Sequence, residues 1–539
     1  GKLIFAPAPS ATSAQHSARA VMSSACAKCL VPLIRRLPPV KFNPSDPLPH
    51  LGVDQLAVFA KCGHDPSVAG KLIFAPGAKA APPKGFDKLA LTSLSDLPVA
   101  SIEPLTDEAA LARAFAAQAA RITPFALCEA AECVIFVECA NDPSVGAGFF
   151  YLEQRAAAVA GYSVPYRLLP ALADALLAAS SSRLDLSKCV WLHSTGRCGS
   201  TLLCKVLAAM GGIQSLNEPD VYSHLPQGSH RTTEASERAA ALRPVARACT
   251  LLLLHAQRLR HPDQEVIFVK TRAHVVRCHA LLREALPEMR GVFLYRNAVD
   301  FADSACMAFL QQPVMVFLRA RRLDGEYVFG PRMQEACGRL TDPSTAARCN
   351  AVVAAHRDVA LRLGAVGLML HGWMHNMGTA EALLASGDLA CSLRYEDLVE
   401  RKQALAQQML HALGLQGPGP DGVTAAATAG RGGAAATMAD DPPDEDAVVP
   451  SKQLQKARRE SRAERQRVDE AFATQAHQGG NAQLAGRRGR KARGADGRLL
   501  PAEPLYFPPE EVPELRRFMA LHDFLGTVDP YGELPKTLA

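Results

Sequence analysis

The chain of 539 residues lacks two features that would assign it to a protein class directly. No apolar run reaches the roughly 18–20 residues that a helix needs to cross a bilayer, so we expect no transmembrane segment. The four leucines at 251–254 lie between Arg247 and Arg258 and are more typical of a buried helix. Cys26 and Cys29 form the only CxxC among 15 cysteines. Because no second CxxC exists, the sequence does not predict a structural zinc site.

Acidic residues are absent from positions 1–45, which contain six Lys or Arg together with many Ala and Ser. This composition is typical of an organelle transit peptide, and equally of a disordered Ala/Pro-rich tail. Cysteines without regular spacing are typical of reduced thiols. We therefore expect a cytoplasmic protein or one of an organelle matrix, such as that of a mitochondrion or plastid.

Aromatic residues make up only 6% of the chain. The most basic stretch, 452–493, has 12 Lys or Arg against four Asp or Glu, a local charge of +8, but lacks interleaved aromatic residues. Because the total net charge is +6, the rest of the chain carries about −2. A solvated helix is therefore favoured over a nucleic-acid site for this stretch.

Changes in composition divide the chain into five segments. The first is transit-like or disordered, and the second is an N-terminal α/β extension. The third alternates strand and helix patterns, the fourth is a low-complexity charged insertion, and the fifth holds a helix expected to pack on the core. In order, they span residues 1–84, 85–184, 185–415, 416–500 and 501–539.

The N-terminal extension predicts helices near 107–120 and 168–180 and a strand at 133–137, but it offers no recognisable chemistry. We expect it to cover one side of the domain that follows. The heptapeptide Gly-Lys-Leu-Ile-Phe-Ala-Pro occurs at 1–7 and again at 70–76, and nothing in the sequence between the two copies matches. A single duplicated heptapeptide does not indicate a repeat architecture.

Residues 185–415 predict an α/β fold. Apolar strand patterns alternate with helical ones, which is typical of a three-layer sandwich around a mostly parallel central sheet. In such sheets ligands bind at the carboxyl ends of the strands, so the strand ends mark candidate site residues. The five expected strands are 188–194, 212–216, 266–270, 291–295 and 389–395.

The first of these strands leads into Thr195–Gly196–Arg197–Cys198–Gly199–Ser200–Thr201, the most informative segment of the chain. Its two glycines permit close approach of the backbone, and its last two residues begin an apolar helix. Such a strand–turn–helix directs backbone N–H groups and the positive end of a helix dipole at one spot, which favours an anion such as phosphate. Arg197 stands where an ATP- or GTP-hydrolysing loop would end in Gly-Lys-Ser/Thr, so the pattern differs from the usual P-loop.

The second strand leads to a candidate general base. Glu218 follows the strand end, and Pro219 is expected to hold it in an extended conformation. A carboxylate beside an anion-binding loop suits proton abstraction from a hydroxyl group. A helix-capping acid is the plain alternative, and His224, six residues further on, is a rival base.

The next two strands end in cations. Lys270 ends the third strand, and Arg296 follows the fourth, with Ser304 two helical turns further on in a helix expected at 298–310. A magnesium-dependent triphosphatase needs an acid at a strand end to hold the metal. Cations there favour a polyanion bound without a metal ion, so no metal site is expected. The last strand leads to Tyr395, which could contact a base or pack against its neighbours.

These elements, in this order, resemble the sulfotransferase superfamily, whose members take a sulfuryl group from 3′-phosphoadenosine-5′-phosphosulfate. The loop at 195–201 is similar to the family's 5′-phosphosulfate loop in its arginine form, as in the membrane and tyrosine-protein branches. Arg296 with Ser304 is similar to the family's 3′-phosphate element, and Tyr395–Leu398 reads Tyr-Glu-Asp-Leu as a later family segment does.

The resemblance covers about 185–415 and has two departures. Ala298 stands where the family often has proline. The late Gly-rich segment that closes over the nucleotide has no clear counterpart, with Arg431–Gly433 and Ser451–Lys456 as the available candidates.

The resemblance implies a P-loop-like fold and transfer of a sulfuryl group to a hydroxyl acceptor of unknown identity. It implies that Glu218 is the base and that Arg197 and Lys270 stabilise the transferred group and the leaving oxygen. It implies no metal. The donor would be held by Thr195, Gly196, Cys198, Gly199, Ser200, Thr201, Arg296, Ser304 and Tyr395. Two alternatives stay open: a kinase or nucleoside triphosphatase of the P-loop class, and a non-catalytic P-loop scaffold.

Overall fold

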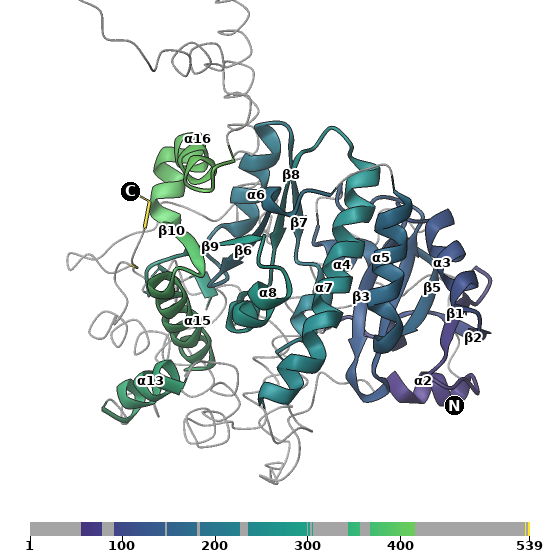
Figure 1. Ribbon diagram of the computed structural model, residues 1–539. Coiled ribbons are helices and arrows are strands. Elements are labelled where there is room, and N and C mark those ends of the chain that lie inside the picture. Colours follow the sequence, from purple (N-terminus) through teal and green to yellow (C-terminus); the bar gives the residue numbers. More distant parts are fainter. Residues whose placement is uncertain are drawn as a thin grey trace, which may run out of the picture.

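The computed structural model describes two five-stranded sheets, one parallel and one antiparallel, with helices packed against them (Figure 1). The expected α/β class is therefore confirmed. The described residues are 55–77, 91–145, 148–180, 184–226, 235–298, 300–301, 304–305, 343–355, 367–415, 534 and 537–538.

The parallel sheet has the strand order β10-β9-β6-β8-β7, and every neighbouring pair runs in the same direction. Its strands are apolar runs buried on both faces, as expected for parallel strands covered by helices. All five were predicted from the sequence to within one residue at each end. They are β6 (Cys189–Ser194), β7 (Ile213–Asn217), β8 (Val266–Lys270), β9 (Arg290–Tyr295) and β10 (Leu389–Arg394).

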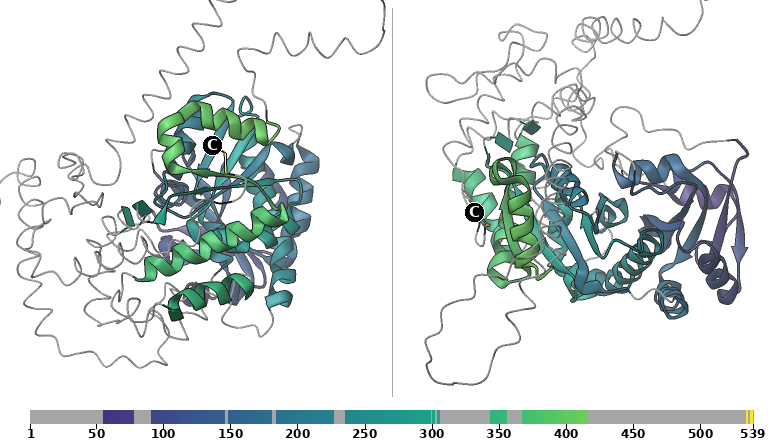
Figure 2. Two further views of the ribbon diagram at one scale, coloured as in Figure 1. Left: turned by 90° about the vertical axis from the view of Figure 1, so that its left-hand side faces the viewer. Right: turned by 90° about the horizontal axis from the view of Figure 1, so that it is seen from above.

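Helices cover both faces of the parallel sheet because successive side chains of each strand point to opposite sides. On one face, Leu192, Phe268 and Leu294 share a core with α6 (Ser200–Ala209) and α16 (Tyr395–Ala412). On the other, Trp191 and Val269 share a core with two further helices, α7 (Ala235–Arg260) and α8 (His279–Ala285). Beside β10 lies α15 (Gly367–Ser386), with α13 (Pro343–Ala355) next to it (Figure 2).

The antiparallel sheet has the order β2-β1-β5-β4-β3. Its strands are β1 (Ala69–Phe74), β2 (Val99–Leu105), β3 (Ile122–Cys128), β4 (Cys133–Cys139) and β5 (Ala158–Pro165). Its helices are α2 (Gln55–Lys61), α3 (Glu108–Ala117), α4 (Phe150–Ala157) and α5 (Leu169–Ala179). Among the described residues, the short 3-10 helices are η2 (Leu94–Asp96), η3 (Glu129–Ala131), η4 (Tyr166–Leu168), η5 (Leu186–Lys188), η6 (Asp220–His224) and η7 (Ala273–Cys278).

The two sheets share one hydrophobic core. Phe136 and Tyr162 of the antiparallel sheet belong to the same buried cluster as Trp191 of the parallel sheet. Helix α5 lies along α7 between them (Figure 1). The N-terminal extension therefore covers one side of the parallel domain, as the sequence predicts.

The expected boundary at residue 84 is wrong, because ordered structure begins earlier. Strand β1 lies within the segment expected to be transit-like or disordered, and it pairs with both β2 and β5. The second copy of the duplicated heptapeptide, 70–76, supplies most of this strand. Leu72 of this copy is fully buried, so the second heptapeptide contributes to the core beside the sheet.

Among the described residues, α7 is the one helix long and apolar enough to cross a membrane. Of its most apolar stretch, 67% is buried against the rest of the protein, including the four leucines at 251–254. It packs as the buried helix that the sequence predicts.

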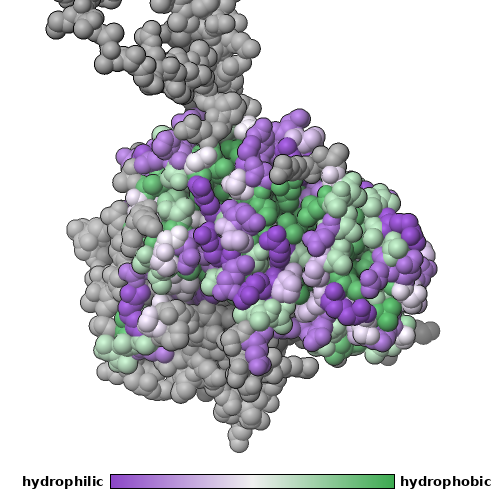
Figure 3. All heavy atoms as spheres, viewed as in Figure 1, coloured by the Kyte–Doolittle hydropathy of each residue, from purple (hydrophilic) through white to green (hydrophobic). Residues whose placement is uncertain are grey.

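Two expectations lie mostly outside the described residues. These are the insertion at 416–500 and the C-terminal helix within 501–539. Near the C-terminus, Thr537 forms a parallel bridge with Ser392 of β10, and the hydroxyl of Tyr295 lies 3.1 Å from that of Thr537. On the surface seen in Figure 3, hydrophilic and hydrophobic residues are interspersed.

Two glycines allow a test of the core packing with opposite outcomes. A Cβ at Gly161 in β5 would lie 2.8 Å from the backbone oxygen of Phe136, whereas a Cβ at Gly372 in α15 would meet nothing within 4 Å. We expect Gly161→Ala to lower the free energy of unfolding by about 1–3 kcal/mol through overpacking. Gly372→Ala should raise it by up to about 1 kcal/mol, because alanine favours the helix. Urea denaturation measures both, and equal effects would contradict the packing described.

Candidate functional site

The loop at 195–199 lies where the order of the parallel sheet reverses. It follows β6, the middle strand, which has β8 on one side and β9, the next strand in the chain, on the other. Ligands of open parallel sheets bind outside the carboxyl ends of the strands at such a position. The sheet topology thus places the most informative segment of the sequence at the expected site.

The loop backbone is shaped by left-handed residues. Gly196 and Gly199 have φ of 75° and 80°, and Arg197 between them has φ of 54°. Helix α6 begins directly after Gly199, and no side chain caps its N-terminus. Gly199, the residue before the first turn, has no side chain that could accept from its N–H groups, and a helix N-terminus of this kind favours a bound anion.

Tyr395 packs against this loop. A Cβ at Gly199 would lie 2.6 Å from Cδ2 of Tyr395, so the ring fits only because residue 199 is glycine. The guanidinium of Arg296 lies over the same ring, 4.4 Å from its centroid. Of the two roles left open for Tyr395, packing is the one its contacts support.

Two arginines connect the loop to the segment that follows β9. Arg296 donates through Nη1 to the carbonyl oxygen of Arg197 at 3.5 Å. Arg197 donates through Nε to the hydroxyl of Ser304 at 3.3 Å. Ser304 is helical, as are the described residues 298, 300–301 and 305 of the helix expected at 298–310. The sequence paired Ser304 with Arg296, whereas the hydrogen bond joins Ser304 to Arg197.

Lys270 lies beneath the loop and is almost completely buried, with a side-chain exposure of 2%. Its ammonium is 2.6 Å from Oε1 of Glu218 and 3.2 Å from the hydroxyl of Thr201 in α6. The three residues predicted from separate segments therefore form one cluster. Burial makes this pairing necessary, because an unpaired charge in the interior costs several kcal/mol.

Glu218 is not extended, so that expectation is wrong. Its φ is +60°, in a region that residues other than glycine rarely adopt. Two contacts with one residue hold it there: its N–H donates to the carbonyl oxygen of Lys270 at 2.7 Å, and its carboxylate accepts from the same residue's ammonium. These contacts outweigh the steric preference that Pro219 imposes.

Three loop residues point inward. Thr195 and Ser200 are buried, and Cys198 is fully buried with its thiol directed at the carbonyl oxygen of Leu294, 3.3 Å away. Burial raises the pKa of the Cys198 thiol. Cys198 can therefore contribute only its backbone N–H to an anion site.

Helix α4 of the N-terminal extension and the residue before it supply aromatic side chains that sequence reasoning missed. The ring of Phe149, at the start of α4, lies 5.1 Å from the ammonium of Lys270. Tyr151 stacks on Phe149 and lies 4.2 Å from the guanidinium of Arg272. Burial raises the pKa of Tyr151 to about 12. The N-terminal extension, in which the sequence shows no recognisable chemistry, thus forms one wall of the cluster around Lys270. No local sequence motif predicts this contact.

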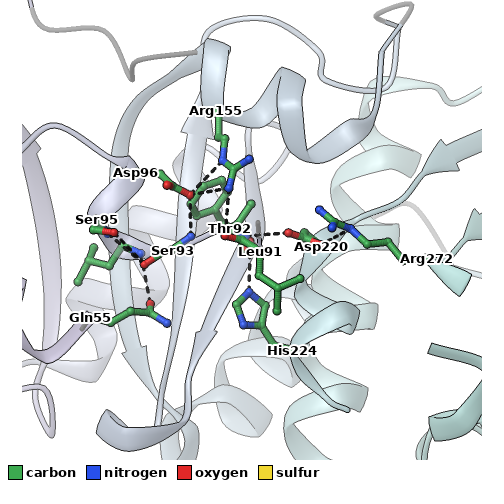
Figure 4. Close-up of polar contacts among 12 residues, drawn as sticks. Gln55, Leu91, Thr92, Ser93, Ser95, Asp96, Arg155, Asp220, His224 and Arg272 are labelled. Atoms are coloured by element: carbon green, nitrogen blue, oxygen red, sulfur yellow. Dashed lines mark hydrogen bonds and ion pairs between the residues drawn. The ribbon is translucent and has the colours of Figure 1, made fainter. Parts of the chain in front are cut away.

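A second buried polar cluster joins the two sheets next to this wall (Figure 4). Asp220 is fully buried; it accepts from the N–H of Thr92 at 2.7 Å and pairs with Arg272 at 2.8 Å. On the other side of Thr92, Arg155 pairs with Asp96 at 2.7 Å. These contacts fix η6, and with it the turn that carries Glu218.

His224 is directed toward the antiparallel sheet, with Nε2 3.3 Å from the hydroxyl of Thr92 (Figure 4). Burial lowers its pKa to about 4. Its hydrogen bond therefore lies in the cluster between the sheets, whereas Glu218 contacts Lys270 directly. The position of the rival base favours Glu218.

In the part of the chain that the structure describes, no group of three or more His, Cys, Asp or Glu side chains could hold a metal ion. No family profile, curated protein or solved structure matches the chain. The geometry of the cluster around Lys270 and the loop is therefore the basis for assigning a function.

The burial of His224 predicts a pH dependence of stability. Its pKa is 6.5 in the unfolded chain and about 4 in the folded protein, so between these values only the unfolded chain binds the proton. The stabilisation is complete above pH 6.5 and is lost as the pH falls to about 4, by at most roughly 3 kcal/mol. His224→Gln should flatten the fall in unfolding free energy measured by urea denaturation. An unaltered slope in His224→Gln would contradict the prediction.

Proposed function

We propose that this protein is a sulfotransferase of P-loop-like fold that transfers a sulfuryl group from 3′-phosphoadenosine-5′-phosphosulfate to a hydroxyl acceptor. The observation that carries the proposal is the convergence of two cations on one loop. Lys270 ends β8 and Arg296 follows β9, the strands on either side of β6; Lys270 contacts Thr201, and Arg296 contacts the carbonyl oxygen of Arg197. Cations on both sides of an uncapped helix N-terminus suit a donor with anionic groups at two ends.

In the proposed reaction the acceptor oxygen attacks sulfur as its proton passes to Glu218. The new bond joins the acceptor oxygen to sulfur, and the bond from sulfur to the 5′-phosphate oxygen breaks. The leaving group is 3′-phosphoadenosine-5′-phosphate. Lys270 and Arg197 offset the charge that develops on the sulfuryl and leaving oxygens.

The contacts of Glu218 support its role as the base. The carboxylate is held by the lysine that would stabilise the leaving oxygen, so base and electrophile are fixed relative to each other. A base positioned in this way accelerates proton transfer by roughly 10²–10⁴-fold. Phe149 lies over the same ammonium and would border the acceptor side.

The roles proposed for the loop are mostly backbone roles. The N–H groups of 196–201 would hold the 5′-phosphate, with Thr201 contributing its hydroxyl. Arg296 and Ser304 would hold the 3′-phosphate. Arg197 contacts both of these residues and would thereby connect the 3′-phosphate site to the loop that holds the 5′-phosphate. Tyr395 would keep Arg296 in place by stacking.

A kinase or triphosphatase of the P-loop class, and a scaffold without activity, are distinguished by ligand binding. Calorimetry should detect 3′-phosphoadenosine-5′-phosphate without added metal, and weaker binding of ATP with magnesium. Tighter binding of ATP with magnesium would favour the kinase, and binding of the sulfotransferase product without turnover would favour the scaffold.

Arg296→Ala tests recognition of the 3′-phosphate. We expect it to weaken binding of 3′-phosphoadenosine-5′-phosphate by about 2–3 kcal/mol, because a charge-assisted partner is lost. Adenosine 5′-phosphate, which lacks the 3′-phosphate, should be affected far less. The control is Arg290→Ala, at the opposite end of β9, where the guanidinium contacts Leu413. Equal losses for both nucleotides would show that Arg296 does not recognise the 3′-phosphate.

Glu218→Gln tests the base. Product affinity should change little, whereas turnover should fall by roughly 10²–10⁴-fold. Glu265→Gln is a matched control, because Glu265 also pairs with a lysine, Lys188, but at the amino end of the sheet. Full turnover in Glu218→Gln would remove the assignment.

A further inference from the structure

A chain of buried hydrogen bonds crosses the parallel sheet beside the cluster around Lys270. The hydroxyl of Thr271 lies 2.9 Å from Nδ1 of His193 in β6. Nε2 of His193 lies 3.0 Å from Nδ1 of His279 in α8. Nε2 of His279 lies 3.2 Å from the carbonyl oxygen of Asp388, just before β10. Thr271, His193 and His279 are each at most 1% exposed.

The direction of every hydrogen bond in this chain follows from its last acceptor. A carbonyl oxygen can only accept, so Nε2 of His279 carries the proton. Burial lowers the pKa of His279 to about 4 and holds that of His193 well below its usual value, so both rings are neutral. Nδ1 of His279 must then accept from Nε2 of His193, and Nδ1 of His193 must accept from Thr271.

The sequence makes room for this arrangement at Gly291. A Cβ at that position in β9 would lie 2.7 Å from Cε1 of His279. The two imidazoles meet edge to face, with centroids 4.9 Å apart and planes at 85°. The charged groups that act on His279 are Asp388, before β10, and Arg283, one turn further along α8.

We infer that His193 and His279 form a directional relay that fixes the hydroxyl of Thr271 and thereby positions Lys270 beneath the anion-binding loop. The tautomers follow from the hydrogen bonds between two neutral, buried rings, whereas the positioning of Lys270 rests on the proposed function. Both histidines are positioning residues, because neither contacts the cluster directly.

Thr271 can transmit this constraint because of where it lies. Its N–H donates to the carbonyl oxygen of Leu192 at 3.0 Å, which continues the pairing of β8 with β6 beyond Lys270. Its neighbours on either side pair with acids, Lys270 with Glu218 and Arg272 with Asp220. A rotation of the backbone at residue 271 would move both cations at once.

Nitrogen-15 NMR of the histidine rings in the full-length protein tests the relay without any substrate. Both rings should show the tautomer protonated at Nε2, unchanged from about pH 8 to about pH 5, where exposed histidines titrate. Protonation of either ring at Nδ1 in the neutral form, or titration of either ring between about pH 8 and about pH 5, would overturn the relay.

Thr271→Val and Thr271→Ser test the positioning. Valine keeps the shape but removes the donor, whereas serine retains it. Thr271→Val should change the nitrogen-15 shift of Nδ1 of His193 and weaken binding of 3′-phosphoadenosine-5′-phosphate roughly tenfold, because misplacing a binding group is costly. Thr271→Ser should restore both values. His193→Gln, checked by urea denaturation for an intact fold, should weaken binding similarly.

The outcomes separate the relay from the proposed function. The expected tautomers together with undiminished binding in Thr271→Val would overturn the positioning of Lys270 and leave the relay. Tight binding of ATP with magnesium would refute the proposed donor while the NMR result still stands. Loss of binding in Thr271→Ser as severe as in Thr271→Val would overturn the role of the hydroxyl.

Discussion

A buried ammonium group requires partners, and this requirement at Lys270 organises the carboxyl edge of the parallel sheet. The carboxylate of Glu218, the hydroxyl of Thr201 and the ring of Phe149 each come from a different element. Removing such a partner strands a desolvated charge at a cost of several kcal/mol. The turn after β7, the start of α6 and the docking of the antiparallel sheet are therefore coupled through one nitrogen atom.

The parts of the structure that the sequence predicted are those set by local pattern. Buried parallel strands are short apolar runs, so β6 to β10 could be recognised together with their ends. Because parallel strands end at one edge, Lys270 and Arg296 could be expected near the loop. Phe149 and Tyr151 could not, since their position depends on how a second sheet docks, and nothing in their local sequence records this contact.

Two errors have the same physical origin. The backbone of Glu218 departs from the preference that Pro219 imposes because long-range contacts with Lys270 stabilise it. Strand β1 was missed because an isolated apolar heptapeptide has no preference for one sheet until β2 and β5 flank it. In both cases tertiary contacts decide between conformations that differ by only a few kcal/mol.

The common core of the two sheets has a consequence for how the protein unfolds. Trp191 lies in the middle of the parallel sheet, yet its cluster continues through α7 into Phe136 and Tyr162. Separating the sheets would expose this apolar surface at roughly 25 cal/mol for each Å². A chain begun at residue 185 would carry the loop and its cations but would lack the part of this core that Phe136 and Tyr162 belong to. The antiparallel sheet is thus not a detachable module, and the described residues should behave as one cooperative unit.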